Sequence, residues 1–303
     1  MTKFLYLTKR DLLLYFRDRG AVFFSLLSML IIIALMLLFL GDMHINGIVE
    51  MLSALPAHDT ADDKKNAEIF MLTWTFAGII PINAAMVALS TLSSIIKDKE
   101  TGKSRAIHTA PISHFTITLS YITAACIASV LICLITLAIS ESYLCIKGME
   151  MFTFAEHIKL FGMILANSFT YSAIMYLCAV FVKSEGAWSG LGTVIGTLVG
   201  FLGGIYLPIG NLSEGLQNVL GCTPVIYGTV MFRNVMTSGI TNVMFADAPS
   251  EMVDKTQMIM GIDYSVFGSN VSAAECVTTV LVFGLVFTML GAAATVFKNH
   301  KDR

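Results

Sequence analysis

The sequence predicts an all-α integral membrane protein with six transmembrane helices and with both termini in the cytoplasm. The chain of 303 residues is 56% hydrophobic and only 13% charged, which is about half the charged share of a typical soluble domain. Long segments contain no Asp, Glu, Lys or Arg, and the basic residues are concentrated in the segments that would share one side of a membrane. These observations indicate a chain whose surroundings are mostly hydrocarbon.

Six uncharged apolar runs are long enough to cross a bilayer, which takes about 20 residues of helix. They predict spans at about residues 21–40, 69–96, 115–139, 160–182, 187–207 and 276–297. The first run is too long for the apolar region of a cleaved signal peptide, so we interpret it as a retained span. The whole chain, 1–303, is expected to form a single transmembrane domain.

The distribution of Lys and Arg predicts the orientation. With the N-terminus inside, thirteen basic residues fall in the short inner segments and six in the longer outer segments. This asymmetry is typical of cytoplasmic loops. Before the first span, residues 2–19 predict a helix that lies in the inner headgroups. In that helix, polar residues share one arc and apolar residues lie roughly opposite: Arg10, Asp11, Arg17 and Asp18 against Leu5, Leu12, Leu13 and Phe16.

Little in the sequence suggests catalysis on this chain. Gly102-Lys103-Ser104 resembles the end of a phosphate-binding loop, but Lys97 replaces the first glycine of that motif. The six His are expected in solvated loops, because no two have the spacing of metal ligands on one helix face. We therefore expect no catalytic residue, no metal, no cofactor and no nucleic-acid partner. Cys145 and Cys222 both fall in outer segments, so a disulfide between them is possible, but the sequence cannot establish it and free thiols are favoured.

Ion-driven transport is also disfavoured, because none of the six predicted spans contains an ionisable Asp, Glu, His, Lys or Arg. Two classes remain: an ATP-independent channel or facilitator, and a permease that is energised by another chain.

Glycines recur every four residues in the fifth predicted span, at Gly192, Gly196, Gly200 and Gly204. Positions four apart share one face of a helix, so these glycines would form a groove of bare backbone. The groove fits either a subunit interface or close packing inside one bundle.

The inner segment 97–114 is the most informative part of the chain. Its charged part, residues 97–105, is typical of a short surface helix, and Pro111 favours an end to the helix just before it. A solvated loop that obeys the positive-inside rule would explain the charges alone. A docking element for a cytoplasmic partner would explain the helix as well.

Two motifs in the chain resemble the permease subunits of ABC-2-type ABC transporters. The inner segment is similar to the family's coupling helix at Asp98, Lys99, Glu100 and Gly102, and again at Ala110, Pro111, Ile112 and Ser113. Residues 208–235 resemble the extracellular re-entrant helices, at Pro208, Leu212, Pro224, Tyr227 and Arg233. Two departures concern the inner segment: Lys103-Ser104 stands where the family usually has Thr-Leu, and His108 replaces an aliphatic residue.

The resemblance implies the membrane-spanning permease subunit of an ATP-driven exporter. ATP and magnesium would then be bound by a separate cytoplasmic ABC ATPase subunit that docks on the inner segment. It also implies a second permease subunit, identical or different, with the first and fifth spans near the dimer interface. The expected location is the plasma membrane of a bacterium, where lipid surrounds the multi-pass chain.

Overall fold

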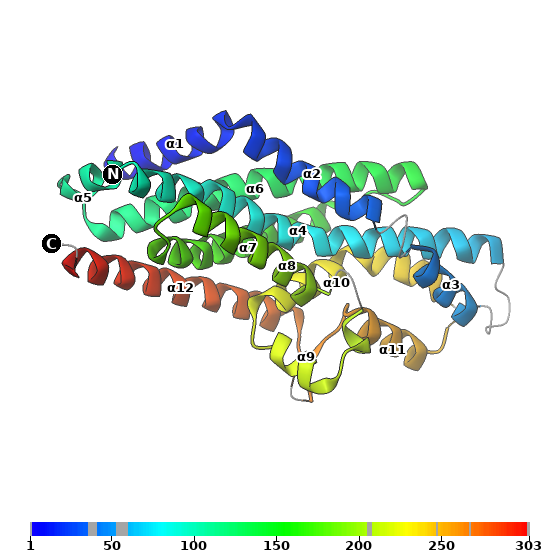
Figure 1. The fold of residues 1–303 in the computed structure, drawn as a ribbon. Coiled ribbons are helices and arrows are strands. Elements are labelled where there is room, and N and C mark those ends of the chain that lie inside the picture. Colours follow the sequence, from blue (N-terminus) through cyan, green and yellow to red (C-terminus); the bar gives the residue numbers. More distant parts are fainter. Residues whose placement is uncertain are drawn as a thin grey trace.

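The computed structural model describes residues 2–35, 41–52, 60–204, 208–246, 248–266 and 268–301. These residues form an almost entirely helical fold with one short antiparallel hairpin (Figure 1). The elements are α1 (Thr2–Arg17), α2 (Arg19–Leu35), α3 (Gly41–Leu52), α4 (Thr60–Glu100), α5 (Lys103–Thr109), α6 (His114–Lys147), α7 (Phe154–Phe181), α8 (Glu185–Leu202), η2 (Ile209–Asn211), α9 (Glu214–Leu220), α10 (Pro224–Met244), α11 (Ser250–Met260), β1 (Ser265–Val266), β2 (Ser269–Asn270) and α12 (Ala273–Lys301).

Four helices in the described part of the chain are long and apolar enough to cross a membrane. They are α4, α6, α7 and α12, and they correspond to the second, third, fourth and sixth predicted spans. The first and fifth predicted spans correspond to the shorter helices α2, with 17 residues, and α8, with 18. Both of these predicted spans continue into residues 36–40 and 205–207, which lie outside the described residues.

Some spanning helices are longer than the apolar runs that predict them. The 41 residues of α4 correspond to about 60 Å of helix at 1.5 Å per residue, about twice the thickness of a hydrocarbon core. Helices α6 and α7 also continue past their apolar runs, and the connection between them is short because Gly148 ends α6 and Thr153 begins α7. The segment 140–159, expected to be a loop, is therefore mostly helical.

Helix α4 lies at the centre of the bundle and packs against α6, α7, α8 and α10, while α12 packs mainly against α7. The buried apolar side chains of these helices form one continuous core. Figure 1 shows both termini at the same end of the bundle as α5, with α3 and α11 toward the opposite end and α9 below the middle. The end with the termini is called the inner end below, and the opposite end the outer end.

A second hydrophobic core lies at the outer end. It joins α3, the first turns of α4, the end of α10 and α11 around Leu52, Phe70, Trp74, Met244 and Met260. The sequence predicts a loop over residues 41–68, but the structure has α3 there, and α4 already begins at Thr60. Cys145 and Cys222 are both free thiols, so the structure contains no bridge between them.

Candidate functional site

The inner segment is a helix–turn–helix connection between α4 and α6. Helix α4 continues to Glu100, and Gly102 then adopts a left-handed conformation with φ of 75° before α5. Glycine takes this conformation without the steric penalty of a side chain. An extended turn follows, and Ser113 caps α6 by accepting a hydrogen bond from the Thr116 amide at 3.2 Å. The predicted short helix is therefore α5, and it begins six residues later than expected.

Helix α1 holds this segment from one side. Arg10 forms ion pairs with Asp98 at the end of α4 and with Asp11 at 3.1 Å. Lys3 donates a hydrogen bond from Nζ to the Pro111 carbonyl at 2.8 Å. These two contacts connect α1 to both ends of the inner segment.

Asp11 is a buried acid at the centre of this contact, although the sequence places it on a polar arc. Its carboxylate is only 1% exposed, and one of its oxygens has no hydrogen-bond partner. Burial raises the pKa of Asp11 to about 7; Arg10 opposes that shift and Asp98 adds to it. Tyr121 of α6 also interacts with this cluster.

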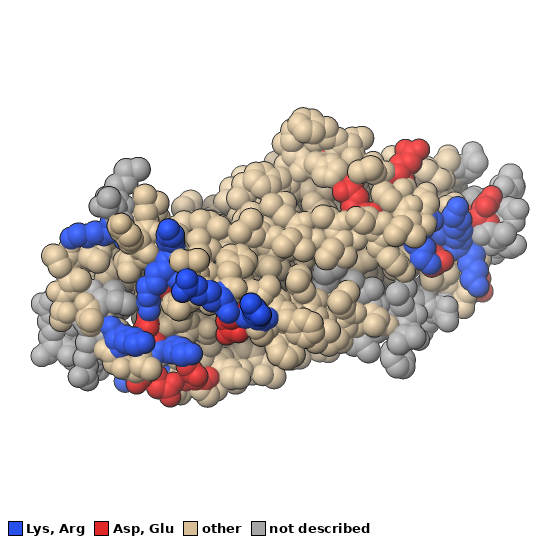
Figure 2. All heavy atoms as spheres, turned by 90° about the horizontal axis from the view of Figure 1, so that it is seen from above, with Lys and Arg blue, Asp and Glu red and all other residues tan. Residues whose placement is uncertain are grey.

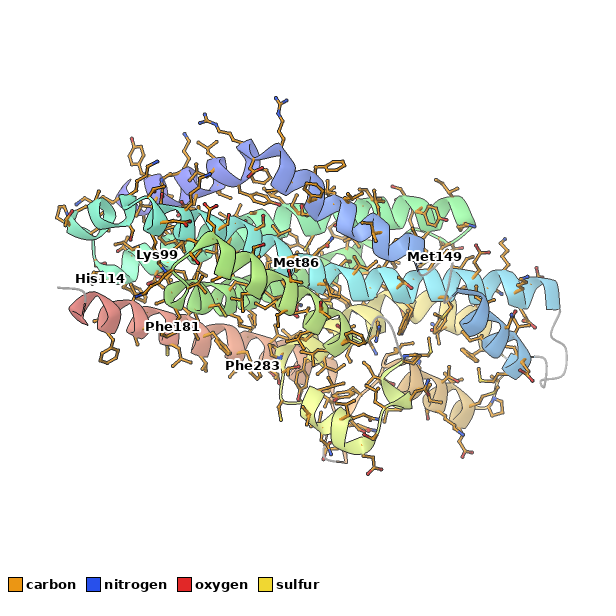
Figure 3. All side chains as sticks on the ribbon, in the orientation of Figure 1. Met86, Lys99, His114, Met149, Phe181 and Phe283 are labelled. Carbon is orange, nitrogen blue, oxygen red and sulfur yellow. The ribbon has the colours of Figure 1, made fainter. Side chains whose placement is uncertain are left out.

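The same segment is also bound to α7 and α8. The Lys99 ammonium donates to the carbonyls of Ala179, Val180 (3.1 Å) and Val182 (3.0 Å), at the C-terminus of α7. The last carbonyls of a helix have no partner within it and favour a cation. Glu100 accepts a hydrogen bond from the Glu185 amide, at the start of α8, at 3.3 Å. Lys99 and the end of α7 at Phe181 lie at the inner end in Figure 3.

The remaining side chains of the segment form an exposed surface. Lys97, Lys103, Ala106, Thr109 and Pro111 are exposed, whereas Ile112 packs partly against the core. Figure 2 shows Lys and Arg side chains gathered at the inner end, on the face that carries α1. The surface offers charged and small side chains for docking, and the described residues of the segment contain no acid–base pair of the kind that catalysis needs.

The structure brings all eight predicted residues of the inner segment together at the inner end of the bundle. The residues that sequence reasoning missed are their partners on α1, Arg10 and Lys3. Arg10 is 88 positions from Asp98, and Lys3 is 108 positions from Pro111. No local pattern links positions so far apart, so the sequence holds no signal for these pairs.

The glycine groove of α8 faces α4 within the same chain. A Cβ atom added at Gly192 would lie 3.2 Å from Leu89, and one at Gly196 would lie 3.3 Å from Met86. Gly200 is also buried. For Gly192 and Gly196 the geometry therefore matches close packing inside one bundle. The exposed face of α8 carries other residues, and a dimer interface on this helix stays a prediction.

The outer segment 208–235 contains two short helices and the first half of α10. Pro208 precedes η2, Leu212 packs against the main core, and Pro224 is the first residue of α10. The Tyr227 hydroxyl donates to the Gly221 carbonyl at 2.8 Å. The predicted residues thus lie in two short helices and the start of α10. Helix α10 continues to Met244, well beyond residue 235, where the predicted re-entrant region ends.

Arg233, which the sequence places in the outer re-entrant region, joins three elements at the outer end. Its side chain is fully buried, and its guanidinium lies 3.8 Å from the centre of the Trp74 ring. It donates to the carbonyls of Gly204 (2.9 Å) and Met260 (3.4 Å). Gly204, a member of the predicted stripe, lies past the end of α8 with φ of 62°. Burial lowers the pKa of Arg233 to about 9.

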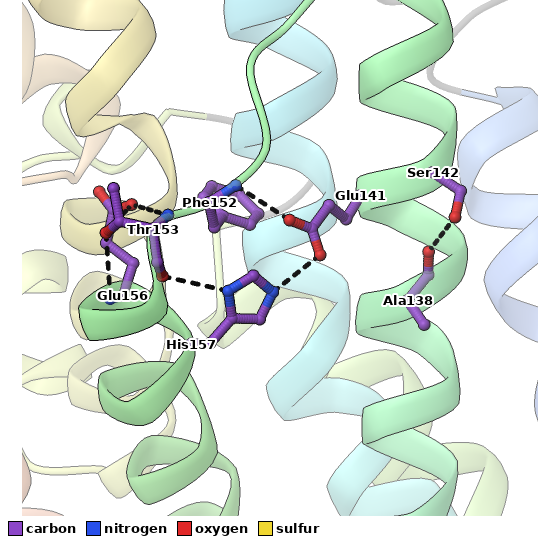
Figure 4. A network of polar contacts seen from close by, with 7 residues as sticks. All are labelled: Ala138, Glu141, Ser142, Phe152, Thr153, Glu156 and His157. Carbon is purple, nitrogen blue, oxygen red and sulfur yellow. Dashed lines mark hydrogen bonds and ion pairs between the residues drawn. The ribbon is translucent and has the colours of Figure 1, made fainter.

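A polar network closes the outer ends of α6 and α7 (Figure 4). Glu141 accepts a hydrogen bond from the Phe152 amide (2.9 Å) and pairs with His157 Nε2 (2.9 Å), while His157 Nδ1 lies 3.1 Å from the Thr153 carbonyl. His157 is thus a partly buried helical residue, whereas the sequence predicts a solvated loop. The Thr153-x-x-Glu156 capping box at the same place is a readable signal for the start of α7.

Comparison with protein families gives one match that covers most of the chain. The family described as ABC-2 family transporter protein matches residues 52–296. The chain belongs to this family. A comparison with curated proteins gives no match.

Membership of the ABC-2 family accords with the spanning helices, and it makes the chain a multi-pass membrane component of a transporter. The family match begins at the end of α3 and ends within α12, so it includes the inner segment and the outer segment. Helix α1, which holds the inner segment, precedes the matched region.

Proposed function

We propose that this protein is the permease subunit of an ATP-driven exporter, and that it couples to a separate cytoplasmic ATPase subunit through residues 97–114. The observation that carries the proposal is the attachment of this segment to the spanning helices. Asp98, Lys99 and Glu100 bind α1, the end of α7 and the start of α8, respectively. A partner that pushes on α5 would therefore move several helices together.

The exposed surface of the segment supports the same proposal. Lys103, Ala106 and Thr109 project from α5 without a role in the core, so a partner can contact them without disturbing the fold. ATP and magnesium would be bound on the partner. A channel or facilitator would not require a rigidly attached segment with an exposed outer surface.

The proposal includes the full topology and assembly. The chain would cross the plasma membrane of a bacterium six times, with α2 and α8 completing the set and the inner end in the cytoplasm. Two permease subunits would form the pathway. Both α2 and α8 expose apolar side chains, among them Phe23, Phe24, Val194 and Leu198. These surfaces support contact with a second permease subunit or with lipid.

A detergent pull-down with identification of the co-purifying chains tests the proposal. An ABC ATPase should co-purify with the native chain, and Ala106→Trp or Lys103→Glu should reduce its recovery. Lys255→Glu, an exposed change at the outer end, serves as the matched control. Equal recovery with all three variants would contradict docking on α5, and transport by the chain alone in liposomes would favour a channel.

A further inference from the structure

An open groove of about 550 Å³ runs along the outer half of α7, between α6 and α12. Clefts of this volume are typical of sites for small molecules. Its lining is apolar apart from one cation, and it includes Lys159, Gly162, Ala166 and Phe169 of α7, Cys126 of α6 and Leu281 of α12.

Small residues on α7 create the hollow. Gly162 and Ala166 are four positions apart, so they share one face of the helix. A Cβ atom added at Gly162 would meet no heavy atom within 4 Å, so the space above it is open. Ile158 and Leu165 are exposed along one side of this face, because positions seven apart lie on the same side of a helix, and they form an apolar wall for whatever occupies it.

The length of the groove matches one leaflet of a membrane. Lys159 and Phe169 are ten residues apart along α7, which corresponds to about 15 Å of helix. Half of a hydrocarbon core of about 30 Å has the same depth. Lys159 is also the last charged residue of α7 before the uncharged run 160–182, so it lies where headgroups meet hydrocarbon.

The surroundings of the groove are apolar and exposed, as expected of a surface that faces lipid. Helix α12 exposes large apolar side chains along the spanning segment, including Val282, Leu285 and Met289. Among the described residues that line the groove, only Lys159 is charged. Its ammonium interacts with Glu156, which is not among the lining residues, and a cation at the level of the headgroups attracts a phosphate. We propose that the groove binds one acyl chain of a phospholipid from the outer-end leaflet, with the lipid phosphate on Lys159.

This site goes beyond the proposed transport function and does not depend on it. Bound lipid would fill a hollow beside α7, the helix whose inner end is held by Lys99.

Native mass spectrometry of the purified chain with added phosphatidylglycerol tests the proposal. The native chain should retain one long-lived lipid, and Lys159→Glu should weaken lipid binding about fivefold, because one basic residue near the surface contributes about 1 kcal/mol.

Filling the groove should have the larger effect. Gly162→Phe places a ring in the open space and should abolish the retained lipid, and Ala166→Leu should reduce it. Gly190→Phe is the matched control, because Gly190 is exposed on α8 with equally open space above it. Native-like occupancy in Lys159→Glu or in Gly162→Phe would overturn the proposal. A changed oligomeric state in Gly162→Phe with unchanged lipid would also overturn it, in favour of an interface between copies.

Discussion

At the scale of single residues, the buried and partly buried charges have structural roles, whereas exposed charges are available for docking. Arg10, Asp11 and Asp98 sit between α1 and the bundle, and Arg233 sits between three outer elements. Burying a charge is costly unless it is paired or hydrogen-bonded, and each of these groups has such partners. Their positions fix the ends of helices, so substitutions there should act through stability, whereas exposed residues of α5 should act through binding.

Asp11 should make the docking of α1 depend on pH. Because its folded-state pKa is raised to about 7 from an ordinary value of about 4, the folded chain binds the proton more tightly. Its contribution to stability is therefore complete below about pH 4 and is lost as the pH rises toward 7. We therefore expect the melting temperature in detergent to fall as the pH rises from about 4 to about 7, and to fall less in Asp11→Asn. The same pH dependence in both chains would contradict this assignment.

Arg233 should not be replaceable by lysine. In Arg233→Lys the buried charge would remain, but an ammonium cannot bond to Gly204 and Met260 at once while it stacks on Trp74. The loss of one such hydrogen bond and of the ring contact should cost about 2 kcal/mol. Thermal unfolding in detergent measures this loss. Lys255→Arg, at an exposed position of α11, should leave the melting temperature unchanged, and a native-like Arg233→Lys would contradict the structural role of the guanidinium.

At the scale of elements, apolar runs predict spanning helices well because a bilayer admits few alternatives. Backbone groups in hydrocarbon must be paired within the helix, so an uncharged run of sufficient length is nearly always helical. The same reasoning misses α3 and α11, because these helices are shorter or more polar and are stabilised by the second core around Trp74. The start of α10 is expected only from the resemblance of residues 208–235, and its continuation to Met244 is not predicted. It also misses the contact between Arg10 and Asp98, which arises only when α1 folds back onto α4.

The glycine face of α8 gives the sharpest test at this scale. Gly196→Leu should push α8 away from α4, because Met86 already occupies the adjacent space, and overpacking of this kind costs about 1–3 kcal/mol. Met86→Ala should partly rescue Gly196→Leu by opening that space, a coupling that a double-mutant cycle measures. Thr193→Leu, on the exposed face, is the control. A loss of dimer with unchanged monomer stability would instead place the groove in a subunit interface.

At the scale of the whole molecule, the two ends have different construction. The inner end consists of helix termini held by ion pairs, with basic side chains around them (Figure 2). The outer end has its own hydrophobic core and a buried cation. Anionic lipid of the cytoplasmic leaflet would suit the exposed cations of α1, Lys3, Lys9 and Arg17. The orientation that the basic residues predict stays a prediction.

The orientation itself can be tested with single cysteines in a chain from which the six native cysteines have been removed. Asp62→Cys and Ser250→Cys lie exposed at the outer end, and Lys103→Cys lies exposed on α5. The positive-inside distribution predicts that a membrane-impermeant maleimide labels the first two in intact cells and labels the third only after permeabilisation. All three positions are exposed in the fold, so a difference in labelling reports the side of the membrane rather than burial. Labelling of Lys103→Cys in intact cells would reverse the orientation and would rule out docking of a cytoplasmic ATPase on α5.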